Sequence, residues 1–304
     1  MECKPAAGNV CVSSDIFSCE ADGRVGEMVK RCWPQACYNG ECGESACLAR
    51  SRLIYVVDDE WRLLSFSPAG ETYEFQLIGT LDCPAGPSWP AWPQESAPFS
   101  MSVDRHAIAW VLYNSGEIFW VDTATAKCQP SVFQKGQKGF ELFGMGFVSD
   151  GPGSNQEKLF ISGGEVNLLQ VGDLGYIDPA TTAVTKIGPL PQAEQSPELT
   201  GTGNGSLFAY FPGATSPFVA ELDKSTGQIK QKWFLPATGD TVTAWAFAHW
   251  GGDFFIFVSS QPLFGSEERK VLRLNPTSGQ TQTIMTDVPY RIVGAGVSTC
   301  APVQ

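Results

Sequence analysis

Five segments of this chain end alike, with an apolar strand, a polar or turn-forming residue, and a corner rich in Pro, Thr, Ser and Gly. Asp, Asn and Ser at such a corner accept hydrogen bonds from nearby backbone amides, and Pro and Gly fit the turn geometry. The segments are 64–70, 120–126, 176–182, 221–227 and 273–279. Their starts lie 45 to 56 residues apart, a period typical of units of four strands and not of a solenoid of short coils.

A second recurrence lies earlier in each repeat, where two small residues are separated by one other residue. Positions i and i+2 lie on the same face of a strand, so small side chains there let the first strands of neighbouring units approach one another around an axis. The five pairs are Ser100 and Ser102, Gly144 and Gly146, Gly201 and Gly203, Ala246 and Ala248, and Gly294 and Gly296. Together the two recurrences predict an all-β fold, a β-propeller.

The ends of the chain each lack a neighbour that the other end supplies. The strand at 291–298 has no strand after it, and the strand at 52–57 has no inner strand before it. Pairing the two completes a ring of five blades; six blades would result if the insertion at 163–174 contains a degenerate unit. The pairing brings Cys47 and Cys300 together, so we predict a disulfide between them, which contributes about 5 kcal/mol on the chain-entropy model.

Seven of the ten cysteines precede residue 48. So short a segment buries too little apolar surface to fold without cross-links, and we expect residues 1–46 to form a disulfide module ahead of a propeller at 47–304. Six cysteines are expected to pair among themselves: Cys3, Cys11, Cys19, Cys32, Cys37 and Cys42. The segment contains no Cys-x2-Cys pair and no His, so its residues argue against a zinc site.

Cys83 and Cys128 then remain to pair with each other by elimination. The pairing has a difficulty. Cys83 follows the outermost strand of one unit and Cys128 opens the outermost strand of the next, so the two are expected at opposite ends of their sheets.

Composition limits the partners and the compartment. The net charge of −12 opposes binding to nucleic acid and to anionic lipid surfaces, and no apolar run is long enough to span a membrane. Ten cysteines indicate an oxidising location, so we expect a secreted, periplasmic or cell-surface protein in its mature form, with a lipid-anchored precursor as an alternative. No motif for a cofactor, a catalytic metal or a nucleophilic serine is present.

Two phrases carry a resemblance to a known group of proteins: Cys37-Tyr-Asn-Gly-Glu-Cys42 in the head and Leu174-Gly-Tyr-Ile-Asp-Pro-Ala-Thr181 in a repeat. The chain resembles exported bacterial envelope proteins and lipoproteins in which a short cysteine-rich module precedes a β-propeller. The resemblance covers nearly the whole chain and is architectural. It implies fold and location, and it supplies no catalytic residue and no cofactor.

Ligands of propellers commonly meet the mouth where the inner strands begin. The positions three residues before each small pair are Ala97, Glu141, Glu198, Thr243 and Arg291. Two carboxylates and an arginine at a narrow mouth suit a polar or sugar-like ligand, or an acid/base pair. The competing interpretation, which we favour, is that the arginine pairs with one or both glutamates and closes the entrance.

The loop at 83–93 places Trp89 and Trp92 on a proline-framed segment. Rigid indoles are good stacking platforms for sugars or apolar partners; the alternative is that these rings cap the core. The acidic run at 58–60 is interpreted as an exposed turn and not a calcium site, and His249 as structural.

Three functional hypotheses remain. The first is a non-enzymatic, exported binding or surface-interaction protein whose mouth engages a glycan, peptide or envelope partner. The second is a carbohydrate-active hydrolase or lyase of the five-bladed kind, with Glu141 and Glu198 as the candidate carboxylates. The third is a structural component of a surface assembly.

Overall fold

The computed structural model describes residues 8–12, 15–31, 36–38, 41–43, 49–69, 72–89, 95–165, 172–190, 197–213, 216–237 and 239–304. The chain divides into two compact units, Met1–Ala49 and Arg50–Gln304. In the part of the chain described, no helix is both long and apolar enough to cross a membrane.

The N-terminal unit contains two small antiparallel sheets. A three-stranded sheet is formed by β1 (Asn9–Val12), β2 (Asp15–Cys19) and β3 (Val25–Arg31), and a hairpin by β4 (Ala36–Tyr38) and β5 (Glu41–Gly43). Cys19 takes part in a disulfide, and Cys37 lies opposite Cys42 in the hairpin register. Cys3 and Cys32 fall outside the described residues, so the pairing within this unit stays a prediction.

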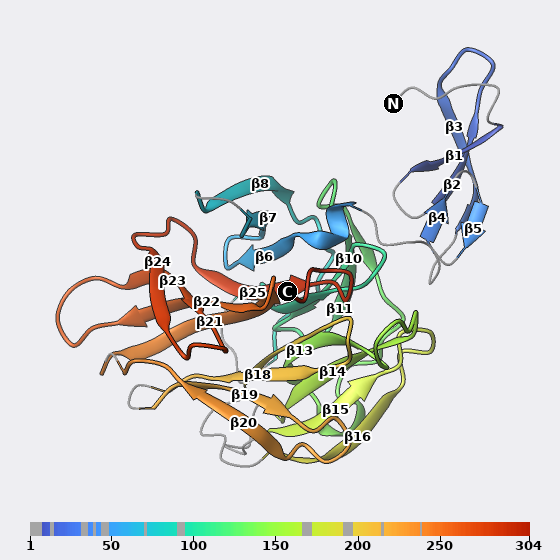
Figure 1. The fold of residues 1–304 in the computed structure, drawn as a ribbon. Helices are drawn as coiled ribbons and strands as arrows, with labels where there is room; N and C mark the ends of the chain where they lie inside the picture. Colours follow the sequence, from blue (N-terminus) through green and yellow to red (C-terminus); the bar gives the residue numbers. More distant parts are fainter. Residues whose placement is uncertain are drawn as a thin grey trace. The chain divides into compact units, whose positions relative to one another are not determined.

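The second unit consists of antiparallel four-stranded sheets, of which the described residues contain five (Figure 1). One sheet joins the two ends of the chain in the order β25 (Ile292–Val297), β6 (Ile54–Asp58), β7 (Arg62–Ser67) and β8 (Glu74–Thr80). β25 is antiparallel to β6, with Val297 opposite Ile54. The predicted pairing of the last strand with the first strand after the head is therefore present.

The other four sheets follow one another along the chain, each with its four strands in sequence order. Their strands are β9 (Pro98–Val103), β10 (Ile108–Tyr113), β11 (Ile118–Asp122) and β12 (Cys128–Pro130); β13 (Leu142–Ser149), β14 (Glu157–Gly164), β15 (Asp173–Ile177) and β16 (Val184–Pro189); β17 (Glu198–Gly201), β18 (Leu207–Phe211), β19 (Phe218–Leu222) and β20 (Ile229–Phe234); β21 (Thr241–Trp250), β22 (Asp253–Gln261), β23 (Glu268–Leu274) and β24 (Thr281–Met285).

The predicted corners connect the third strand of each sheet to its fourth. At one of them the Asp178 carboxylate accepts hydrogen bonds from the backbone amides of Ala180 (2.9 Å) and Thr181 (3.0 Å). The same kind of contact recurs at Asp122, Asp223 and Asn275. The side chains at the corners therefore form the turns that their residue types predict.

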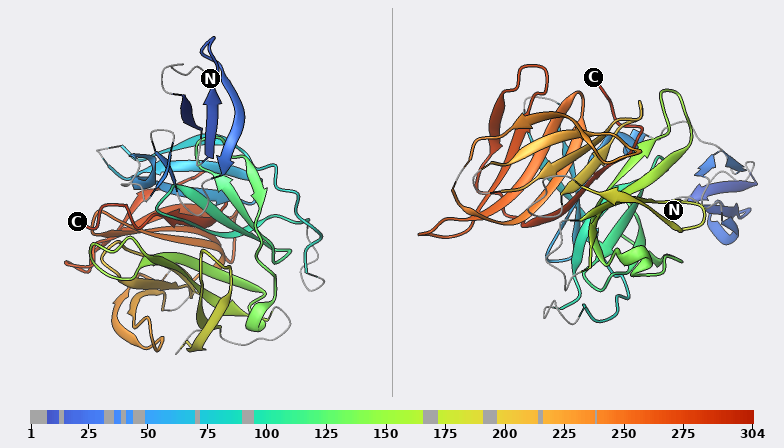
Figure 2. Two further views of the ribbon diagram at one scale, coloured as in Figure 1. Left: turned by 90° about the vertical axis from the view of Figure 1, so that its right-hand side faces the viewer. Right: turned by 90° about the horizontal axis from the view of Figure 1, so that it is seen from below.

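The first strands of the five sheets contact one another in a closed series, β25 to β9, β9 to β13, β13 to β17, β17 to β21 and β21 to β25. Figure 2 shows these sheets from two further directions. Apolar clusters fill the spaces between neighbouring sheets. Tyr55 and Val57 of the sheet that joins the termini pack with Met101 of one neighbour, and Phe66 packs with Phe257 of the other.

Small residues permit the inner strands to approach closely, as expected. A Cβ atom added to Gly146 would lie 2.8 Å from the Cα of Thr200, and one added to Gly296 would lie 2.7 Å from the Cα of Ser102. Both distances are too short for a real contact with backbone, so these positions exclude any larger side chain.

The third predicted small pair is in the wrong register. The residues of β17 that face Gly144 and Gly146 are Glu198 and Thr200, not Gly201 and Gly203. The hydroxyl of Thr200 accepts a hydrogen bond from the backbone amide of His249 (3.2 Å). The hydroxyl of Ser102 accepts a hydrogen bond from the backbone amide of Phe147 in the same way (2.9 Å). Gly201 and Gly203 lie beyond them and pass close to other backbone segments. A buried carboxyl group therefore stands where the other inner strands have Ser, Gly or Ala.

A disulfide joins Cys83 to Cys128, with Cα atoms 4.9 Å apart. The expected obstacle, that the two lie at opposite ends of their strands, is removed by sheet twist. Adjacent strands rotate by roughly 20–25°, so an outermost strand is far from parallel to the innermost and the end of β8 reaches the start of β12. Asp82 accepts the Cys128 amide (3.0 Å) beside the bridge. Cys300 is also disulfide-bonded, but its predicted partner Cys47 lies outside the described residues.

Candidate functional site

A cavity of about 340 Å³ opens where the inner strands begin. Four of the five predicted mouth positions line it: Ala97, Glu198, Thr243 and Arg291. Asp59, Phe99, Asn114 and Trp245 are among the other lining residues. Glu141, the remaining predicted position, is half-buried at the start of β13 and is not among the residues that line this cavity. We refer to the space as the mouth cavity.

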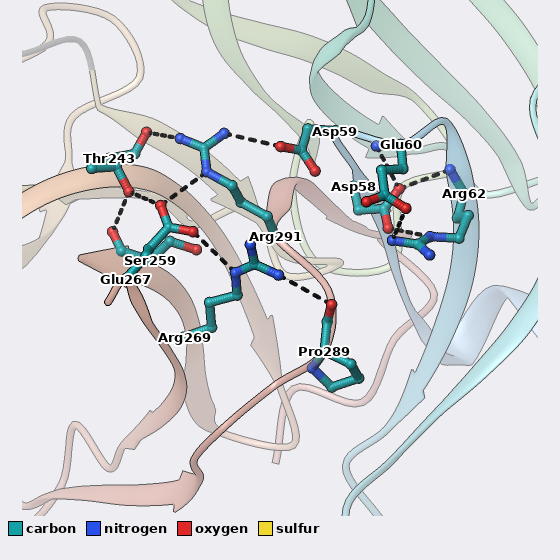
Figure 3. Close-up of polar contacts among 10 residues, drawn as sticks. All are labelled: Asp58, Asp59, Glu60, Arg62, Thr243, Ser259, Glu267, Arg269, Pro289 and Arg291. Carbon is teal, nitrogen blue, oxygen red and sulfur yellow. Dashed lines mark hydrogen bonds and ion pairs between the residues drawn. The ribbon is translucent and has the colours of Figure 1, made fainter. Parts of the chain in front are cut away.

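Arg291 is held by three groups from different parts of the chain (Figure 3). Its Nε donates to Glu267 Oε1 (3.1 Å), its Nη2 donates to the carbonyl oxygen of Thr243 (2.7 Å), and its Nη1 lies 3.4 Å from Asp59 Oδ2. The expected pairing with Glu141 or Glu198 is therefore wrong. The guanidinium is bound instead by the β6–β7 turn of its own sheet and by β21 and the β22–β23 turn of the neighbouring sheet.

Glu267 is the acidic centre of this network. Its carboxylate accepts hydrogen bonds from the hydroxyl of Thr243 (2.6 Å) and from Nε of Arg269 (3.0 Å), in addition to Arg291. Burial acts to raise the pKa of Glu267, but these hydrogen bonds outweigh it and hold the pKa below its ordinary value. Glu267 is therefore ionised at neutral pH. Neither recurrence indicated Glu267, because it lies just before β23, outside both of them.

Glu198 is buried, with 4% of its surface exposed, and accepts a hydrogen bond from the hydroxyl of Ser100 (3.1 Å). Burial raises the pKa of this carboxyl well above its ordinary value, and the hydrogen bonds from Ser100 and from the amides of Met145 and Leu199 only partly oppose it. The raised pKa favours the protonated form of the carboxyl group, which can itself donate a hydrogen bond. Gly144 makes room for it, since a Cβ there would lie 3.1 Å from the Glu198 Cδ.

Trp89 is half-buried and lies against the turn between β10 and β11. Its amide donates to the carbonyl oxygen of Asn114 (3.1 Å), a Cβ added to Gly116 would meet its indole nitrogen at 2.7 Å, and Lys135 Nζ lies 5.2 Å from its ring centroid. These contacts agree better with a ring that caps the turn than with an exposed platform. Trp92 lies outside the described residues.

The acidic residues at 58–60 differ in their surroundings. Asp58 is fully buried, unlike the exposed turn that we expected, because its carboxylate bonds to Arg62 and accepts the amides of Glu60 and Arg62. Asp59 alone points to the mouth cavity. Across the described residues no three His, Cys, Asp or Glu side chains are grouped so as to hold a metal ion. His249 is buried against Phe208, and burial lowers its pKa to about 4.

Fold and site together define an all-β, propeller-type protein with a charged mouth. No protein-family model matches the chain, and no curated protein matches it. A solved structure described as a nidogen/laminin complex is similar to 80% of this chain and 97% of its own, at 9% identity and a TM-score of 0.43. An endo-arabinase from Bacteroides thetaiotaomicron is similar over 67% and 84%, at 11% identity and a TM-score of 0.41. Such values define no family, so the fold assignment rests on the strand pairing of the chain itself.

Proposed function

We propose that this chain is a non-catalytic, exported binding protein and that its ligand, a glycan or a peptide, enters the mouth cavity. The observation that carries the proposal is the way Arg291 is fixed. Three protein groups orient one guanidinium beside a cavity that Phe99 and Trp245 also line. A preorganised polar group next to aromatic surface is the usual composition of a small-ligand site.

The architecture that we propose is a five-bladed propeller closed by β25 and β6, preceded by a separate disulfide module at residues 1–46. The closed series of inner-strand contacts and the division of the chain after Ala49 support it. The Cys83–Cys128 bridge is consistent with an oxidising compartment. Secretion, a periplasmic location or a lipid-anchored precursor all satisfy that condition.

The test compares two tryptophans of one strand. Trp245 lines the mouth cavity, whereas Trp250 is at the other end of β21 and donates its indole N–H to the carbonyl oxygen of Arg52 (2.6 Å). Both rings are half-buried. We expect Trp245→Ala to weaken binding to hits from a glycan and peptide array by about tenfold or more, and Trp250→Ala to leave affinity within about twofold. Equal losses in calorimetry would contradict the mouth as the site.

A second function has one observation in its favour. Glu198, whose pKa burial raises well above its ordinary value, and Asp59, close to Arg291, line the same cavity, and glycosidases use two carboxyl groups of which one has a raised pKa. In this case Asp59 replaces Glu141 as the second carboxylate. A polysaccharide screen that detects turnover, lost in Glu198→Gln with the fold intact, would favour a hydrolase over a binding protein.

A further inference from the structure

A second cavity, of about 620 Å³, adjoins the mouth. It lies beside the loop that follows β8 and carries the Cys83–Cys128 bridge. Trp61, Cys83, Gly86, Ser96 and Tyr113 are among its lining residues. We refer to it as the side cavity.

One thin wall separates the two cavities. Ser96 and Tyr113 line the side cavity, while their chain neighbours Ala97 and Asn114 line the mouth cavity. Because chain neighbours line different cavities, a single chain segment separates the two cavities at each of these positions. The β6–β7 turn contributes to both sides in the same way, through Asp59 to the mouth and Trp61 to the side cavity.

The wall is rigid because Asn114 fastens it. The Asn114 side chain accepts the amide of Ala97 (3.0 Å) and donates to the carbonyl oxygen of Glu95 (3.2 Å), and its own amide donates to the carbonyl oxygen of Ala97 (3.0 Å). Asn114 is 3% exposed. A buried amide with all these bonds fixes the shape of both cavities at their common border.

Trp61 is held in an unusual backbone conformation. Its φ of 59° is in the left-handed region, which bulky residues seldom adopt and which is often retained at functional sites. The indole N–H donates to the carbonyl oxygen of Ser96 (3.0 Å), and the carbonyl oxygen of Trp61 accepts the amide of Leu81 (2.7 Å). The ring is therefore a fixed aromatic surface in the wall of the side cavity.

Two buried hydroxyl groups of the side cavity lack a partner. Neither Tyr113 Oη nor Ser96 Oγ has a hydrogen-bond partner within the described ranges, and Tyr113 is 1% exposed. Buried polar groups are almost always hydrogen-bonded. A ligand hydroxyl that enters the cavity can supply the missing bonds after a small side-chain movement.

The chemistry of the lining selects the ligand class. Glu95 is the sole charged residue named among the described lining residues, and it is acidic, so an anionic ligand is disfavoured. An aromatic face together with neutral hydroxyl groups suits a neutral sugar ring. We propose that the side cavity is a subsite for a neutral sugar of an oligosaccharide that crosses the outer edge of the wall and places its next unit in the mouth cavity. This inference rests on the proposed binding function and narrows its ligand to a neutral glycan of at least two units.

The experiment measures affinity against ligand length. The probe is the tightest-binding neutral oligosaccharide series of one to six units from a glycan array, titrated by calorimetry into the full chain. Trp61→Asn removes the indole, and Asn tolerates a left-handed φ, so the backbone is not strained further. Tyr113→Phe removes one hydroxyl and keeps the ring. Trp245→Ala alters the mouth.

We expect Trp61→Asn to lower the ratio of long-ligand affinity to monosaccharide affinity at least tenfold. Tyr113→Phe should weaken the longer ligands by about fivefold, the value of one hydrogen bond. An unchanged ratio of long-ligand to short-ligand affinity in both variants would overturn the side-cavity subsite, even if Trp245→Ala weakens every ligand. Absence of wild-type binding across the series would overturn the narrowing of the ligand to a neutral glycan, whereas binding that is insensitive to Trp245→Ala would instead overturn the proposed function of the mouth cavity.

Discussion

The charges of the mouth act through a few short contacts between hairpin turns. Glu267 and Arg291 are both partly buried, with side-chain exposures of 21% and 26%, so water screens their interaction less than it would at the surface. Glu268, one residue further, pairs with Lys270 and is 47% exposed. The two neighbouring glutamates therefore form a matched pair for experiment.

Replacing Glu267 with Gln should lower the free energy of unfolding by about 1–2 kcal/mol, because it weakens three hydrogen bonds to one carboxylate. Glu268→Gln should change it by less than about 0.5 kcal/mol, as is usual for exposed ion pairs. Urea denaturation of both variants provides the measurement. Equal effects would show that the network at Arg291 contributes no more than a surface pair.

A second buried acidic site, at the start of β10 and of β14, predicts a pH dependence. Asp104 is 3% exposed and accepts the amides of His106 and Ile108 (both 2.9 Å), while Glu157 accepts the Thr299 hydroxyl (2.6 Å). Burial raises the pKa of each carboxyl to about 7, and for Glu157 the charge of Asp104 adds to the effect.

Because the folded pKa of Asp104 exceeds the value of an unfolded aspartate, the folded state binds the extra proton between about pH 4 and pH 7. The contribution of Asp104 to the free energy of unfolding therefore falls as pH rises through that window, by up to about 1.4 kcal/mol per pH unit. Asp104→Asn should flatten this slope. It should also lower the free energy of unfolding by an amount that does not depend on pH, because the new amide faces the indole of Trp110. Parallel wild-type and variant curves from pH 5 to pH 8 would contradict the raised pKa.

At the scale of strands, the innermost strands of the sheets pack so closely that larger side chains do not fit between them. Gly146→Ala places a Cβ against the Thr200 backbone, whereas the same change at Gly164, in β14 of the same sheet, meets nothing within 4 Å. Gly146→Ala should destabilise the fold by about 1–3 kcal/mol, the usual cost of overpacking. Gly164→Ala should lie within about 1 kcal/mol of wild type in thermal unfolding. Similar melting temperatures for the two variants would show that the inner strands are not tightly packed.

Local patterns predicted most of these elements because they arise from local chemistry. The Asp178 corner and the Gly146 contact follow from turn chemistry and from strand periodicity. The register of β17 was missed because a buried Glu198 breaks the small-residue pattern, while Gly201 and Gly203 imitate it three residues later. Sheet twist, which brings Cys83 to Cys128, accumulates over four strands and leaves no mark on any single segment.

At the scale of the whole molecule, the pairing of the two end strands was predictable and the interior of the mouth was not. The unmatched strands at the two chain ends indicated their pairing, and four of five mouth positions line one cavity. The partners of Arg291 come from two hairpin turns: Asp59 from the β6–β7 turn of its own sheet, and Glu267 from the β22–β23 turn of the neighbouring sheet. Turn length and direction depend on tertiary packing, so strand periodicity carries no information about them.

The Cys83–Cys128 bridge should stabilise the fold as a cross-link between neighbouring sheets. It closes a loop with a sequence separation of 45 residues, which corresponds to at most about 4 kcal/mol on the chain-entropy model. The double variant Cys83→Ser/Cys128→Ser should therefore unfold at a lower denaturant concentration with a similar dependence on denaturant. An unchanged midpoint would show that the bridge does not constrain the unfolded chain.

The central claim is that the closed ring binds an oligosaccharide across the mouth and side cavities. A crystal structure of the full chain with its tightest neutral oligosaccharide tests it most directly. The expected result is one sugar in contact with Trp245 and Arg291 and the next against Trp61, on opposite sides of the wall that Asn114 fastens. A ligand bound away from both cavities, or one that contacts neither tryptophan, would contradict the claim.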